Sequence, residues 1–446
     1  MSYRRFQFGV FFLTLLFLLA RTPVWNMVWD ADGYFNSSVS IVTGTFDANK
    51  FFVRGVLTSL VYLIPSFVGL RFLEPTVFGT YLYVLVLLQN ALIVSFVGSF
   101  IIPRLLELFI PRSKSALVAS SLLSVYAFQS FVPYSLIDVF AVALLIPSVY
   151  LMNSHRNIVA LIYGLILGIA VNLRPSYLAT AIFLALCAAV IQRRRSLIFY
   201  SGLIISQLPQ VIFNWMYFKS FSFLALASEK FAGSNYSFAA YAIRVDSRAY
   251  PQIGKSEPLI FCDKRMFDLA KQSDLTSTFD MLVMFVKNPI AAFAFEVKKI
   301  SSAFWWPVTV PYYDHNPLVN TVFGAVIAFV VVSGTSMLVL LFVKSTTKKS
   351  LFGFVAIYFG FLVNIILYHN EPRYALPIVV VSIGGFVLLC MKLFNLPLAV
   401  ALPEVTRNWK LATAVVYLIV VLSAMLVLVG DQGFASLSSC GSFPDL

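Results

Sequence analysis

Long apolar stretches recur along most of this chain of 446 residues, and they constrain its fold more than any single motif does. Apolar residues make up 60% of the sequence and charged residues only 11%, which is more apolar surface than one water-soluble core could bury. Runs of roughly 18 to 25 apolar residues have the length of a membrane-spanning helix. The sequence therefore predicts an all-α, polytopic membrane protein.

About eleven runs are candidate transmembrane helices. The stretch 54–72 is also apolar, but Pro65 interrupts it, and we place it at the outer membrane surface instead. The eleven predicted spans are 6–24, 77–102, 116–131, 139–152, 158–171, 178–191, 197–213, 318–343, 351–368, 378–391 and 411–429.

The basic residues predict the orientation of these spans. Arg4 and Arg5 precede the first span, and Arg112, 193–195 and 344–349 fall in alternate connections. Such connections are cytoplasmic by the positive-inside rule. On this topology the entire net charge of +13 lies inside, so it predicts no nucleic-acid partner. The N-terminus is then cytoplasmic and the C-terminus lies outside.

This topology divides the chain into two transmembrane modules, 1–213 and 318–446, joined by a large outer loop, 214–317. A first outer loop, 25–76, lies within the N-terminal module and contains a candidate interfacial helix, with apolar Phe35, Val39, Val42 and Phe46 opposite serines. The later loop is polar enough to form a small outer domain with a helix in 278–304.

The four cysteines divide between the predicted spans and the outer side. Cys187 and Cys390 fall inside predicted spans, where a thiol usually serves packing. Cys262 and Cys440 both fall outside, where a disulfide can form. We predict a bridge between Cys262 and Cys440, with two buried free thiols as the alternative.

Chemistry must be sought among polar residues of the outer face, because the predicted spans hold no comparable cluster of acids. Asp30 and Asp32 follow the first span directly, and Lys50 and Arg54 lie further along the same loop. The chain has no glycine loop for phosphate, no His/Cys metal spacing and no nucleophile elbow. Nucleotide-driven transport and hydrolase chemistry are therefore not favoured.

An outer-surface acid beside cations suits one reaction well. The acid can serve as base for an acceptor hydroxyl, while cations bind the phosphate of a lipid-linked sugar. A lipid monophosphate leaves as a stable anion, so this reaction needs positive charge and no general acid.

The arrangement resembles the type C (GT-C) integral-membrane glycosyltransferases that use polyprenyl-phosphate sugars. It is similar to the aminoarabinose and mannose transferases and to the O-antigen glucosyltransferases. The similarity is carried by the acidic first outer loop, the helices around Lys50 and Arg54, the turn Asn172-Leu173-Arg174-Pro175, and Glu371-Pro372-Arg373-Tyr374 at the start of a late span.

The resemblance implies that Asp30 or Asp32 is the catalytic base. It implies an inverting transferase that moves one sugar from undecaprenyl phosphate to a periplasmic acceptor, such as a lipid-linked glycan, in a bacterial inner membrane. The candidate donor-phosphate ligands are Lys50, Arg54, Arg174, His369 and Arg373, and the candidate substrate ligands are Tyr34, Asp138, Glu371 and Tyr374.

Several alternatives remain open from the sequence. The acids can be capping or solubilising residues, Arg373 can pair with Glu371, and Asp138 can be a helix N-cap or a ligand of a divalent cation. Transfer to a protein such as pilin, an oligosaccharide polymerase or ligase, and a lipid-linked sugar flippase are the alternative functions. No resident cofactor is predicted.

Overall fold

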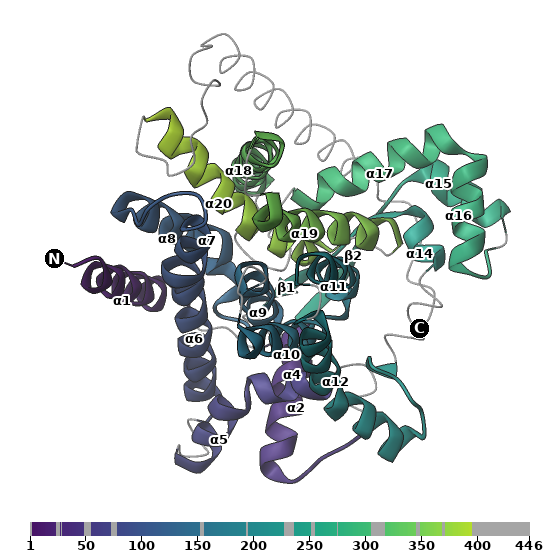
Figure 1. The fold of residues 1–446 in the computed structure, drawn as a ribbon. Coiled ribbons are helices and arrows are strands. Elements are labelled where there is room, and N and C mark those ends of the chain that lie inside the picture. The colour runs from purple at the N-terminus through teal and green to yellow at the C-terminus, as the bar shows by residue number, and fades with distance from the viewer. Residues whose placement is uncertain are drawn as a thin grey trace.

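The computed structural model describes residues 2–23, 27, 29–48, 55–72, 78–151, 156–192, 195–226, 236–250, 255–273, 275–304, 317–344, 348–367 and 371–394. Helices dominate this part of the chain (Figure 1). The described residues of ten of the eleven predicted spans lie on helices. The eleventh, 411–429, lies outside the described residues.

Most helices of the bundle follow one another with short connections, and the two long connections are 22–77 and 219–316. They are α1 (Tyr3–Arg21), α6 (Phe78–Phe96), a π-helical turn (Val97–Ile101), α7 (Ile102–Leu106), α8 (Lys114–Phe128), a short 3-10 turn (Gln129–Phe131), α9 (Asp138–Leu151), α10 (Asn157–Leu173), α11 (Leu178–Gln192), α12 (Ser196–Phe218), α18 (Pro317–Lys344), α19 (Lys348–Leu367) and α20 (Leu376–Leu393).

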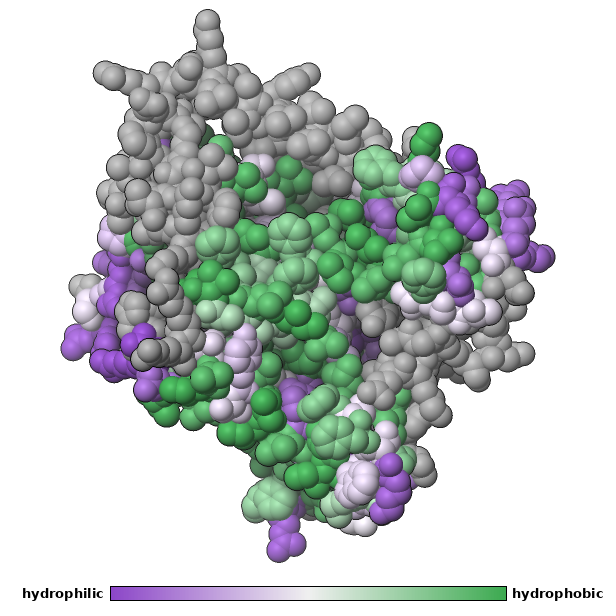
Figure 2. Space-filling view, turned by 45° about the vertical axis from the view of Figure 1, so that its right-hand side comes forward, coloured by the Kyte–Doolittle hydropathy of each residue, from purple (hydrophilic) through white to green (hydrophobic). Residues whose placement is uncertain are grey.

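The outer surface of this bundle is apolar. On α11, Leu178, Ile182, Leu186 and Val190 recur every four residues and are 40 to 74% exposed. Figure 2 shows that apolar side chains cover a broad face of the molecule. Such a face is expected where helices contact lipid, because no water is present there to solvate polar side chains. The structure thus supports a multi-pass membrane protein.

Helix lengths do not establish the predicted count of spans. In the described residues, five helices are long and apolar enough to cross a membrane, or six if one bent pair forms a single span. Further apolar helices, among them α9, α10 and α19, are shorter. The coarse prediction of an all-α membrane protein therefore holds, while the number eleven is not established.

Glycines allow three helix pairs of the bundle to approach closely. A Cβ added to Gly164 of α10 would lie 2.0 Å from the carbonyl oxygen of Phe199 on α12. One added to Gly385 of α20 would lie 2.2 Å from the carbonyl oxygen of Gly334 on α18. Gly360 of α19 meets α11 equally closely. Small residues at contacts of this kind are typical of helix packing in membranes.

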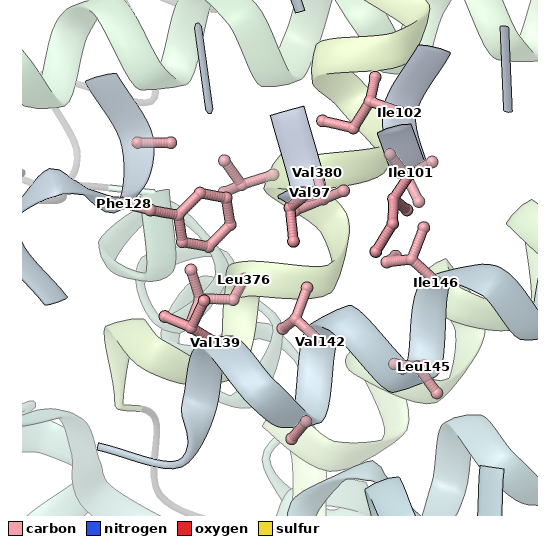
Figure 3. Close-up of a cluster of buried hydrophobic side chains, with 14 of the residues drawn as sticks. Val97, Ile101, Ile102, Phe128, Val139, Val142, Leu145, Ile146, Leu376 and Val380 are labelled. Atoms are coloured by element: carbon pink, nitrogen blue, oxygen red, sulfur yellow. The ribbon is translucent and has the colours of Figure 1, made fainter. Parts of the chain in front are cut away.

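A compact apolar core lies beneath one end of the bundle. Figure 3 shows Phe128, Val139 and Leu376 close together, and these residues come from α8, α9 and α20. Val139 directly follows Asp138, and Leu376 directly follows the 3-10 turn Pro372–Ala375. This core therefore fixes the helix ends that carry several predicted site residues, and we call this end of the bundle the site end.

The opposite end of the bundle is basic. The guanidinium of Arg112 lies 5.8 Å from the ring of Tyr3, and the ammonium of Lys114 lies 5.4 Å from the ring of Phe6. Helix α8 runs from Lys114 at this end to Phe128 at the site end. The N-terminal helix therefore begins beside a basic connection, away from the site end.

In its described residues, the first connecting segment forms the helices α2 (Trp29–Thr43), α4 (Val56–Val61) and α5 (Leu63–Phe72). The described part of stretch 54–72, residues 55–72, is thus broken at Tyr62 into two helices, each too short to span a bilayer alone. The expected serine face of α2 is not solvated. Ser37, Ser38 and Ser40 are buried, and Ser38 donates a hydrogen bond to the carbonyl of Ser59 on α4.

Residues 236–304 form a small domain beside the bundle, including a β-hairpin that the all-α prediction lacked. It contains α14 (Tyr236–Tyr241), antiparallel strands β1 (Ala242–Tyr250) and β2 (Lys255–Cys262), α15 (Lys264–Gln272), α16 (Thr278–Lys287) and α17 (Pro289–Phe304). Its own apolar core includes Ile243, Met266, Met281 and Phe295. Helix α17 also packs against α18, α19 and the turn before α20.

Candidate functional site

Five charged side chains from four separate segments meet at the site end. Asp30 lies in the first turn of α2, Asp138 begins α9, and Arg174 follows the last residue of α10. Glu371 and Arg373 belong to the turn before α20. We call these five residues the ion cluster. All five were predicted as site residues from the sequence.

Arg373 joins two segments that are 343 positions apart in the sequence. Its Nη2 donates to Oδ2 of Asp30 at 2.7 Å and to Oε2 of Glu371 at 2.6 Å. Its Nε donates to the same Glu371 oxygen at 2.9 Å. Charge-assisted contacts of this length are among the stronger hydrogen bonds in proteins. The predicted pairing of Arg373 with Glu371 is therefore present, and Asp30 extends it.

Arg174 forms the second half of the cluster. Its Nη2 lies 2.7 Å from Oδ1 of Asp138 and 3.7 Å from Oε2 of Glu371. Its guanidinium lies 5.2 Å from the ring centre of Tyr374, within cation–π range, and Tyr374 donates to Oε1 of Glu371 at 3.1 Å. Glu371 thus contacts both arginines.

Burial makes these charges depend on one another. The side chain of Asp138 is completely buried, and those of Arg174 and Arg373 are 9% and 10% exposed. Burial is the largest single influence and lowers the pKa of Arg174, but Asp138, with Tyr34 and Tyr374, raises it, and the net shift is upward, so the guanidinium stays charged. Three acids face two arginines, which leaves the cluster a formal charge of −1. A buried charge that lost its partner here would be costly.

Neutral side chains hold the loop that carries Asp138. Asn90 of α6 donates to the carbonyls of Val132 and Tyr134, at 3.0 and 2.7 Å. Tyr62 donates to the carbonyl of Leu136 at 2.8 Å. Ser135 donates to the carbonyl of Ala31 at 2.5 Å, which ties this loop to the turn between Asp30 and Asp32. These contacts set the spacing of Asp30 and Asp138.

A polar ladder on α12 similarly anchors the end of α10. Gln207 donates to the carbonyl of Gly168 at 2.7 Å and accepts from Asn172 at 3.3 Å. Gln210 accepts a hydrogen bond from the backbone of Val56 at 2.8 Å. The ladder fixes Asn172, two residues before Arg174, so the predicted turn Asn172-Leu173-Arg174-Pro175 has a rigid base.

The remaining predicted site residues divide into three groups. Asp32 is exposed and, among the described residues, makes no ion pair. Tyr34 is buried one turn further along α2, close enough to Arg174 for an electrostatic interaction. Lys50, Arg54 and His369 lie outside the described residues, so their predicted roles stay predictions.

Sequence reasoning missed two neighbours of Arg174. The hydroxyls of Ser176 and Tyr177 are buried and have no hydrogen-bond partner among the described residues. Tyr177 lies close enough to Asp138, Arg174 and Arg373 to interact electrostatically. The Nε of Arg174 is also without a hydrogen-bond partner there. This turn therefore offers donors to a ligand, and its position directly after Arg174 was the available signal.

The described residues test the metal and disulfide predictions only in part. In the described part of the chain, no three His, Cys, Asp or Glu side chains come together as a metal site. Cys187 and Cys390 are free thiols, as expected for cysteines in the bundle. Cys262 is buried and disulfide-bonded. Its predicted partner, Cys440, lies outside the described residues, so the pairing stays a prediction.

Comparisons with known proteins leave the family open. No protein-family model, no curated protein and no solved structure matches the chain. The fold and the site alone define the class of this protein: a multi-pass, mainly helical membrane protein with a buried ion cluster at one end of its bundle. Any more particular assignment depends on the chemistry of that cluster.

Proposed function

We propose that this protein is an inverting glycosyltransferase of the inner membrane of a bacterium. It takes one sugar from undecaprenyl phosphate and transfers it to a periplasmic acceptor, such as a lipid-linked glycan. In this proposal the chain crosses the membrane eleven times, its N-terminus is cytoplasmic, and the site end faces the periplasm. The supporting observation is the contact between Asp30 of the first outer loop and Arg373 before α20.

The two acids of α2 have different roles in this proposal. The carboxylate of Asp30 already contacts the guanidinium of Arg373 at 2.7 Å. Asp32 is exposed and makes no ion pair among the described residues. Asp32 is therefore the better candidate to accept the proton of the acceptor hydroxyl, and Asp30 the better candidate to position Arg373.

The reaction balances without a general acid. The acceptor oxygen loses its proton to the base and attacks the anomeric carbon, while the bond from that carbon to the phosphate oxygen breaks. The lipid phosphate leaves as an anion. The Nε of Arg174 is a candidate donor to it. Because the described cluster already carries a charge of −1, the proposal also requires cations from Lys50, Arg54 or His369.

The test uses purified protein, a polyprenyl-phosphate sugar and an acceptor glycan in detergent. Asp32→Asn should lower turnover by roughly 10² or more, because the amide cannot accept the proton. Asp30→Asn should lower turnover less and raise KM for the donor. Asp268→Asn changes an exposed acid of α15 and should leave both values unchanged.

Two outcomes would refute the proposal. Full turnover in both Asp30→Asn and Asp32→Asn would show that neither acid takes part in the reaction. Absence of sugar transfer in detergent, together with movement of the lipid-linked sugar across vesicles, would identify a flippase instead.

A further inference from the structure

Helices α16 and α17 of the small domain form a bent hairpin. Their axes differ in direction by 116°, and Asn288 at the bend donates through its side chain to the carbonyl of Met284 at 3.1 Å. One face of the hairpin enters the core of the domain through Met281, Phe285 and Phe295. That face explains why the hairpin folds against the rest of the domain.

The other face of the hairpin is also apolar and is not covered by the described residues. Phe279, Leu282 and Val286 follow one another at the spacing i, i+3, i+7 on α16, and their exposed fractions are 72%, 37% and 78%. Helix α17 repeats this spacing. Its exposed apolar residues are Ile290, Phe293 and Val297, which are 80%, 72% and 36% exposed.

Two such stripes are unexpected on a domain that faces only water. A helix side exposed to solvent is normally polar, and a contiguous apolar patch marks a membrane or protein contact. Together the two helices also meet the same hydropathy criterion as the spanning helices of the bundle. Their sharp bend, however, does not suit a single transmembrane span.

The position of the hairpin indicates which partner covers it. Helix α17 packs against α18, α19 and the turn Pro372–Ala375, which carries Arg373. Through α17, the hairpin therefore lies at the level of the ion cluster, where the lipid-facing helices end. Helix α19, against which α17 packs, also exposes apolar side chains, and Figure 2 shows the broad apolar face of the molecule.

We infer that the two stripes of α16 and α17 rest in the bilayer, at the boundary between headgroups and acyl chains on the site end of the bundle. Amphipathic helices bind membranes in this way, with the apolar face inserted and charged side chains in water. Lys287 at the bend is exposed and suited to a headgroup. This lipid contact does not depend on the proposed glycosyl transfer.

The experiment measures the surroundings of single spin labels in the full chain. Val286→Cys, Ile290→Cys and Phe293→Cys place labels on the stripes, in a background with Cys187→Ala and Cys390→Ala. Gln272→Cys, on the exposed surface of α15 in the same domain, is the matched control. The unsubstituted background gives the blank. The proteins are reconstituted in vesicles of phosphatidylethanolamine and phosphatidylglycerol.

Lipid contact predicts frequent collisions of all three stripe labels with oxygen, which concentrates in acyl chains, and few collisions with a water-soluble nickel chelate. The label at Gln272 should show the reverse. Frequent nickel collisions at the stripe positions would show that they face water. Protection from both reagents would show a protein partner or a second copy of the chain. Either of these results would overturn the inference.

Discussion

Arg373 is the residue on which most of the ion cluster depends. It contacts Asp30 and Glu371 directly, and its Nη1 lies 3.9 Å from Oδ2 of Asp138. A guanidinium suits this position because its donors point in several fixed directions. A single ammonium would satisfy fewer of these carboxylates.

We therefore predict that Arg373→Ala lowers the free energy of unfolding by about 3 to 5 kcal/mol, because it removes a largely buried cation and leaves Arg174 as the one arginine of the ion cluster beside its three acids. Arg373→Lys should lose less, since one charge remains. The measurement is denaturant unfolding of the purified protein in detergent, without any donor lipid. If Arg373 served only to bind the donor phosphate, the stability of the unliganded protein would not change.

At the residue scale, the sequence indicated the members of the ion cluster but not their pairing. Asp30, Asp138, Arg174 and Arg373 each follow or precede an apolar run on the same predicted side, and charges at such boundaries are conspicuous. The pairing of acids with arginines depends on how the helices pack. The apolar runs in the sequence do not predict that packing. Neutral residues such as Tyr177 carry no charge that would mark them, so their position directly after Arg174 was the one available signal.

Among the helices, the contact between α18 and α20 depends on backbone approach. Gly385 faces the carbonyl of Gly334, whereas a Cβ on the adjacent Gly384 would have Leu106 as its nearest neighbour, at 3.8 Å. The two neighbouring glycines therefore differ in the space available to them, although both lie in the same helix.

Gly385→Ala should destabilise the protein by about 1 to 3 kcal/mol, because the added methyl group forces the two helices apart. Gly384→Ala is the matched control and should change the thermal unfolding midpoint little. Thermal unfolding of the two purified variants in the same detergent gives the comparison. Equal midpoints would mean that α18 and α20 do not pack this closely.

Helices were predicted better than strands for a physical reason. The apolar runs are long, so the helices α6, α12 and α18 coincide with predicted spans. The strands β1 and β2 are short and mix charged with apolar residues, so no regular alternation marked them. The serines of α2 were expected to face solvent, but their hydroxyls satisfy backbone carbonyls inside the packed segment.

At the scale of the whole molecule, the two ends of the bundle should face opposite sides of the membrane. Arg112 lies at the basic end beside Tyr3, and Ser273 lies on the small domain beside the site end. Reporter fusions at Arg112 and Ser273 should therefore report the cytoplasmic and the outer side, respectively. A fusion at Arg194 should agree with Arg112, and one at Leu446 with Ser273. Agreement between Arg112 and Ser273 would refute the topology.

The ion pair between Asp30 and Arg373 also has a consequence for biosynthesis. The two residues are 343 positions apart, and a ribosome adds roughly 5 to 20 residues per second, so the cation emerges roughly 20 to 70 s after its acid. During that interval α2 is present without the guanidinium that later binds it. A nascent chain arrested before Glu371 would contain the pair of Asp138 and Arg174 but would lack Glu371 and Arg373, so it could not complete the ion cluster, however many helices it had already inserted.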